Sequence, residues 1–147
     1  METKYEVKTI RVQLKAREGK LPVVTSPDRV FEVAKQIYKD LDADQEHFVI
    51  LTLNTQNELE GFKVIASGMM DQVSVDMKIV FRSALLLGAA GLIMVHNHPS
   101  GYTEPSDEDK RLTRGMKDAA TLLGIRLLDH TIVSHTGYFS FLERGLL

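Results

Sequence analysis

The sequence predicts an α/β fold, a single domain in which a mixed β-sheet is flanked by helices. Short apolar runs bounded by glycine or polar residues alternate with segments whose apolar residues recur at helical spacing, which is typical of layered α/β domains. The chain has 147 residues, 44% of them hydrophobic and 26% charged, enough apolar material for one core and too much for a disordered chain. We therefore expect residues 1–147 to form one domain, with an N-terminal strand and loop over residues 1–25.

The N-terminal part of the chain predicts an edge strand and then a helix. Residues 5–14 alternate loosely between apolar and charged side chains, which favours an edge position in a sheet. Ser26, Pro27 and Asp28 are typical of a helix start, with serine as the N-cap, proline at the first helical position and an acid in the first turn. Apolar residues at helical spacing from Val30 to Leu41 give this helix a face toward the core.

The next segment predicts a hairpin in the middle of the sheet. Glu46 opens an apolar run over residues 47–53 that is too continuous for a half-exposed strand, so we expect a central strand. The polar residues 54–57 make a turn, and residues 59–66 return as the antiparallel partner.

The second half of the chain alternates between helices and strands. A glycine at position 124 marks the end of its second helix. The apolar patterns predict helices over residues 76–87 and 107–123, and strands over residues 92–95, 125–133 and 138–141.

A cluster of metal-ligating residue types follows the strand at 92–95. Because side chains alternate across an extended segment, His96 and His98 point to one side and Asn97 to the other. Two prolines and a glycine then force a loop, and Ser106 stands where a helix begins, so that Asp109 lies in the first turn facing the loop. Two imidazoles and a carboxylate make a three-ligand site of the catalytic zinc kind.

A second interpretation of Ser106 and Asp109 is a capping box, in which the serine and the acid satisfy backbone groups at the helix start. Capping does not explain the paired histidines, so we favour the metal site, and both roles can hold together. Asp129 and His130 form another polar pair, for which support of the ligands or buried hydrogen bonding is expected rather than direct ligation. We expect no role for His47 and His135.

The order His-x-His, seven residues, Ser, two residues, Asp resembles the JAMM motif of MPN-domain metallopeptidases. His-Asn-His-Pro-Ser-Gly followed by Pro-Ser-x-x-Asp resembles the RadC-like JAB branch, and the resemblance extends to residues 122–130 and back to residues 46–48. It implies a JAB/MPN fold of cytidine-deaminase-like architecture and one Zn²⁺ per chain. The implied zinc ligands are His96, His98 and Asp109, with Ser106 stabilising the oxyanion and Glu46 as the general base. Many RadC sequences carry His-Pro-Arg-Glu where this chain has residues 76–79, so substrate contacts there are open.

The resemblance implies a zinc-dependent peptidase or isopeptidase acting on a peptide or isopeptide substrate. The alternative is a RadC-type DNA-repair or mobile-element accessory protein acting as a binding module, but a formal net charge of -2 does not favour DNA as the partner. The chain has no cysteine, and the zinc site of deaminases needs cysteine ligands, so a site of that type is excluded. The apolar runs fall far short of the roughly 20 residues of a membrane span, so we expect a cytoplasmic protein. The oligomeric state stays open.

Overall fold

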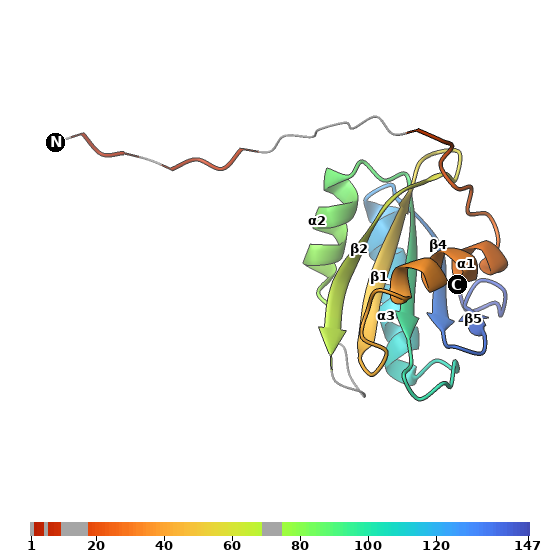
Figure 1. The fold of residues 1–147 in the computed structure, drawn as a ribbon. Coiled ribbons are helices and arrows are strands. Elements are labelled where there is room, and N and C mark those ends of the chain that lie inside the picture. The colour runs from red at the N-terminus through yellow and green to blue at the C-terminus, as the bar shows by residue number, and fades with distance from the viewer. Residues whose placement is uncertain (1, 5, 10–17, 69–74) are drawn as a thin grey trace.

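A computed structural model describes residues 2–4, 6–9, 18–68 and 75–147 (Figure 1). These residues form one α/β unit with a mixed five-stranded sheet, as the sequence predicts. The predicted strand over residues 5–14 lies mostly outside the described residues, and residues 6–9 belong to no strand. Within the described parts of the chain, no helix is long and apolar enough to cross a membrane.

The helices and strands follow the predicted order. The helices are α1 (Pro27–Tyr38), α2 (Met77–Leu86) and α3 (Asp107–Leu122), and the strands are β1 (Glu46–Leu53), β2 (Leu59–Gly68), β3 (Gly91–Asn97), β4 (Arg126–Val133) and β5 (Tyr138–Ser140). Ser26 caps α1 by accepting a hydrogen bond from the backbone N–H of Arg29. Gly124, with a φ of 72°, lets the chain leave α3 and enter β4.

The strands lie in the order β2-β1-β3-β4-β5, and only β3 and β4 are parallel (Figure 1). β1 is central and buried at all but its first residue, because both of its edges are paired and both faces of the sheet are covered. The parallel pairing brings the carboxyl ends of β3 and β4 to the same edge of the sheet. Helix α3 connects these two strands, and its N-terminus returns to that edge.

Two hydrophobic clusters cover the two faces of the sheet. On one face, side chains of α2 and α3 pack on Phe48, Ile50, Leu92 and Met94. On the other face, Val30 and Ala34 of α1 pack on the alternate residues of β1 and β3, which are Val49, Leu51, Leu53, Ile93 and Val95. Side chains alternate along β3, so its last two residues point to opposite faces of the sheet. Residue 96 points to the face covered by α3, and residue 97 to the face covered by α1.

Candidate metal centre

β1 and β3 carry three of the predicted site residues to one end of the sheet. His96 continues the row of Leu92 and Met94 and is 1% exposed. The antiparallel register pairs Phe48 with His96, so Glu46, two residues earlier on the same face, lies level with position 98. Glu46, His96 and His98 each offer one ligand atom, and these three atoms lie within 4.8 Å of one another.

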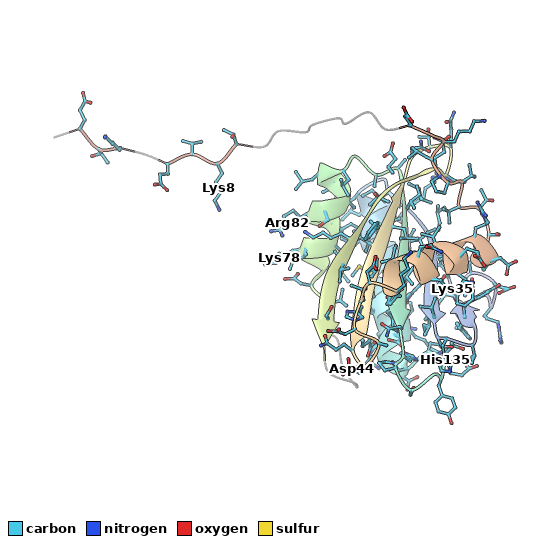
Figure 2. All side chains as sticks on the ribbon, in the orientation of Figure 1. Lys8, Lys35, Asp44, Lys78, Arg82 and His135 are labelled. Carbon is cyan, nitrogen blue, oxygen red and sulfur yellow. The ribbon has the colours of Figure 1, made fainter. Side chains whose placement is uncertain are left out.

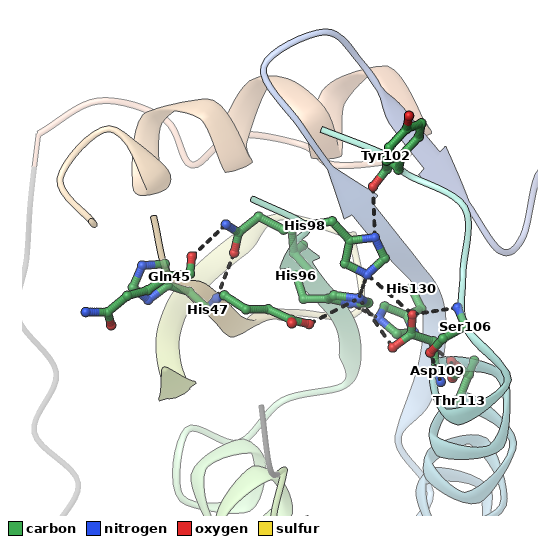
Figure 3. A network of polar contacts seen from close by, with 12 residues as sticks. Gln45, His47, His96, His98, Tyr102, Ser106, Asp109, Thr113 and His130 are labelled. Atoms are coloured by element: carbon green, nitrogen blue, oxygen red, sulfur yellow. Dashed lines mark hydrogen bonds and ion pairs between the residues drawn. The ribbon is translucent and has the colours of Figure 1, made fainter. Parts of the chain in front are cut away.

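Helix α3 carries Ser106 and Asp109 to the same place (Figure 3). The backbone N–H of Asp109 donates to the Ser106 hydroxyl oxygen at 3.0 Å, and the backbone N–H of Ser106 donates to Asp109 Oδ2 at 2.9 Å. The predicted capping box is therefore formed, although its acid is aspartate. The same carboxylate faces the histidines, with Oδ1 3.5 Å from His96 Nε2 and Oδ2 3.5 Å from His98 Nε2.

The spacing of these atoms fits a tetrahedral zinc ion. Zinc–nitrogen bonds of about 2.0–2.1 Å at tetrahedral angles place neighbouring ligand atoms about 3.3 Å apart. The two Nε2 atoms are 3.1 Å apart, and each is 3.5 Å from a different oxygen of the Asp109 carboxylate. Glu46 Oε1 lies farther out, 3.8 Å from His96 Nε2. Two imidazole nitrogens and the carboxylates of Asp109 and Glu46 thus surround one position that a zinc ion fits.

The far nitrogens of both imidazoles are held by other groups. His98 Nδ1 donates to the backbone carbonyl oxygen of Tyr102 at 2.8 Å, which leaves the lone pair of the neutral ring on Nε2 (Figure 3). His96 Nδ1 lies 2.7 Å from Nε2 of the buried His130. This pattern, in which the second nitrogen of each histidine is bound to a backbone or side-chain group, is typical of metal-ligating histidines.

The pKa values around the site reflect its paired charges. Hydrogen bonding to Asp109 raises the pKa of His98 above its usual value, against the opposing effect of burial. Burial alone would raise the pKa of Asp109, but the neighbouring imidazoles of His96 and His98 outweigh it and hold the pKa well below its usual range. Burial lowers the pKa of His130, so this imidazole is neutral. The Asp109 carboxylate is therefore ionised, the form that binds a cation.

Asn97 points to the opposite layer and fixes the backbone on either side of Glu46. Its Oδ1 accepts from the backbone N–H of His47 at 2.7 Å, and its Nδ2 donates to the carbonyl oxygen of Gln45 at 2.9 Å (Figure 3). The amide thus ties the first residues of β1 to the end of β3. Sequence reasoning placed Asn97 on the far side but missed this role, which depends on a contact between residues about 50 positions apart.

The remaining polar candidates separate into supporting and structural residues. His130 lies in contact with His96, as expected of a supporting residue rather than a ligand. Asp129 instead accepts hydrogen bonds from the Ser140 hydroxyl and from the backbone of Leu142, within the β4–β5 corner. Sequence reasoning missed Thr113, whose hydroxyl contacts His130 Nδ1 at 2.6 Å. The sequence does place Thr113 four residues after Asp109 on the same helix, and this spacing puts both residues on one face of the helix.

A pocket of about 240 Å³ lies on the other side of His98, between α1 and the ends of β3 and β4. Figure 2 places His135 at the same end of the molecule as Asp44 of the α1–β1 loop. Apolar side chains of Phe31, Ala34, Tyr38 and Val133 form much of the wall, and Lys35 also borders it. The pocket is therefore an apolar hollow that shares His98 with the ligand cluster.

Comparison with known proteins identifies the family. The family model of the RadC-like JAB domain matches residues 24–146. A UPF0758 protein of Rubrobacter xylanophilus is 40% identical over 132 residues, 90% of this chain and 57% of that protein. UPF0758 proteins of Pelodictyon phaeoclathratiforme and Methylibium petroleiphilum are 42% and 39% identical, over 72% and 93% of this chain and 48% and 61% of their own lengths. The chain therefore spans about half of the length of these relatives, and it belongs to the RadC-like JAB domain family.

Proposed function

We propose that this domain is a zinc-dependent metallohydrolase of the JAMM type that cleaves an amide bond in a peptide or isopeptide. The observation that carries the proposal is the convergence of two imidazole nitrogens and one carboxylate at separations of 3.1 to 3.5 Å. When His98 is neutral, its Nε2 lone pair faces His96 Nε2 at 3.1 Å, and a cation between the two nitrogens would bind both. A zinc ion fits the donor set and the spacing.

Zinc held by His96, His98 and Asp109 would lower the pKa of a bound water to about 7 and polarise the substrate carbonyl. Glu46 stands beside this position, with its side chain only 13% exposed, and would accept the proton of the attacking water. The same carboxyl group would then return that proton to the leaving amine.

Ser106 would supply a hydrogen bond to the oxyanion. Its hydroxyl oxygen accepts from the backbone N–H of Asp109, and a hydroxyl that accepts in this way still has its own hydrogen to donate. The cap therefore orients the side chain without using up its donor. Donors directed at developing negative charge are among the strongest contributions to acyl-transfer catalysis.

The pocket beyond His98 supports an extended substrate. A peptide whose scissile carbonyl lies at the ligand cluster would extend across His98, and a neighbouring apolar side chain would enter the hollow beside α1. DNA remains the alternative partner, but the formal charge of -2 provides no overall attraction for phosphates.

Metal analysis combined with a cleavage assay tests the proposal. We expect about one zinc per purified chain by elemental analysis, and metal-dependent cleavage within a panel of fluorogenic peptides and isopeptide-linked lysine peptides. His98→Ala should lose both properties, whereas His135→Ala should keep the zinc, because His135 is an exposed histidine outside the cluster. Zinc retention by His98→Ala, or salt-sensitive DNA binding without any cleavage, would contradict the hydrolase.

A further inference from the structure

His130 is a buried imidazole to which the proposed reaction assigns no step. It is fully buried, stacks on the Phe141 ring at a centroid distance of 4.6 Å, and contacts His96 through one nitrogen and Thr113 through the other. Figure 3 shows this chain of contacts running from α3 to the candidate ligands. Each contact has a definite donor, and the donors can be assigned in order.

The Thr113 hydroxyl fixes the first donor of this chain. Thr113 Oγ1 lies 2.7 Å from the backbone carbonyl oxygen of Asp109, which can only accept a hydrogen bond. The hydroxyl has one hydrogen, and this contact uses it. At its second contact, 2.6 Å from His130 Nδ1, Thr113 must therefore accept, so Nδ1 of His130 carries the hydrogen.

The two imidazoles continue this chain of hydrogen bonds from Thr113. Burial away from water disfavours a charged ring, and a neutral His130 with hydrogen on Nδ1 has a bare Nε2. This nitrogen accepts from His96 Nδ1 at 2.7 Å, so Nδ1 of His96 carries a hydrogen. The lone pair of a neutral His96 is then on Nε2, which faces His98 and Asp109.

We propose that Thr113 and His130 are positioning residues that hold His96 in the orientation and tautomer in which Nε2 can ligate a metal. This inference rests on the metal site proposed above. The chain begins at the backbone of Asp109 and ends at His96, so it joins two of the three ligands through helix α3 and strand β4. A change at Thr113, which touches neither ligand nitrogen, should therefore alter metal binding.

Zinc affinity in three threonine variants tests the proposal. Thr113→Val keeps the shape of the side chain but removes the hydroxyl, and we expect zinc affinity to fall by about 10- to 100-fold in competition with a chromophoric chelator. Thr113→Ser keeps the hydroxyl and should restore binding. Thr52→Val is the matched control, because Thr52 is equally buried and donates to the carbonyl oxygen of Gly61 away from the site. Equal zinc affinity in Thr113→Val and wild type, or an equal loss in Thr52→Val, would overturn the proposal.

A second measurement reads the tautomer directly and does not need the metal. Nitrogen-15 NMR of the zinc-free protein should show His130 with hydrogen on Nδ1, and Thr113→Val should shift the ring toward the Nε2–H form that an unconstrained imidazole prefers. An Nε2–H ring in the wild type would refute the positioning chain even if zinc binds. If the wild type binds no zinc, the hydrolase proposal fails, while the NMR result still decides how His130 is held.

Discussion

At the scale of single residues, two acidic side chains near the same histidine have different environments. Asp109 is fixed by the Ser106 backbone N–H and reaches both imidazoles, whereas Glu46 starts β1 and lies 3.8 Å from one of them. A rigid carboxylate at a helix start suits a ligand, and one held beside the ligands suits proton transfer. This difference supports the proposed roles of Asp109 as ligand and Glu46 as base, of which the role of Glu46 rested on resemblance alone.

We expect Glu46→Gln to keep zinc and lose turnover. Glutamine has nearly the same shape but cannot accept the proton, so kcat should fall by about 10²- to 10⁴-fold. Elemental analysis and steady-state kinetics on the same sample separate binding from chemistry. Glu60→Gln, at an exposed position of β2, is the control and should match the wild type. Wild-type turnover in Glu46→Gln across the pH range would remove Glu46 as the base.

Ser106→Gly distinguishes a cap from an oxyanion donor. Glycine is tolerated at an N-cap and keeps the backbone N–H that donates to Asp109, so stability should fall by only a few tenths of a kcal/mol. Loss of an oxyanion donor should instead lower kcat by about 100- to 1,000-fold.

The control for Ser106→Gly is Ser26→Gly, which removes the equivalent cap of α1 and should leave kcat unchanged. Thermal unfolding and kcat are measured on both variants. A normal kcat in Ser106→Gly would reduce the hydroxyl to its capping role.

At the scale of elements, local pattern was sufficient for the helices and strands and insufficient for the contacts between them. The starts of α1 and α3 were predicted from their capping residues, and β1 from its continuous apolar run, because these signals lie within a few residues. The contacts of Asn97 with β1 and of Thr113 with β4 were missed, because they depend on strand register and helix docking. Register is fixed by the whole sheet and cannot be read from one segment.

We expect Asn97→Ala to uncouple Glu46 from the metal site. The substitution removes the two hydrogen bonds that join β3 to the backbone of Gln45 and His47, at a cost of about 1–3 kcal/mol. Zinc affinity should stay near the wild-type value because the amide lies on the other face of the sheet, whereas kcat should fall as Glu46 loses its fixed position.

Asn54→Ala is the matched control for Asn97→Ala. The Asn54 side chain accepts from the backbone N–H groups of Gln56 and Glu58 at the opposite end of β1. Its loss should destabilise the fold by a comparable amount, as measured by urea unfolding, without lowering kcat. If both variants lose kcat in proportion to their stability, Asn97 has no specific effect on Glu46.

At the scale of the whole molecule, the site joins three elements that are far apart in sequence. β1 brings Glu46, β3 brings the histidines, and α3 brings Asp109, and the parallel pairing of β3 with β4 places them at one edge of the sheet. A cation held there would bind the folded chain and not the unfolded one, so metal binding should stabilise the entire domain. The fold class could be predicted from sequence and is confirmed, and the candidate ligands could be named from it, but this coupling depends on the assembled sheet.

The stabilisation by zinc should depend on pH in a definite direction. At free zinc about 100-fold above Kd, binding adds about 2.7 kcal/mol, which corresponds to roughly 5–10 °C in Tm for a domain of this size. In the metal-free protein the pKa of His98 is raised, so its contribution to stability is fully present below the ordinary histidine pKa and is lost as pH rises through the folded value. The pKa of Asp109 is lowered, so its carboxylate is ionised across the range from pH 5.5 to 8.

Zinc must displace the proton on His98, and this competition weakens as pH rises. The difference in Tm between zinc-loaded and chelator-treated protein should therefore widen from pH 5.5 to pH 8, because the metal-free form loses its protonated pair while the zinc-loaded form gains its ligand. Differential scanning calorimetry at both pH values measures it. His98→Ala should show a small difference at either pH, and His135→Ala should follow the wild type. A zinc effect that is constant with pH in the wild type would show that the metal is bound without the imidazole of His98.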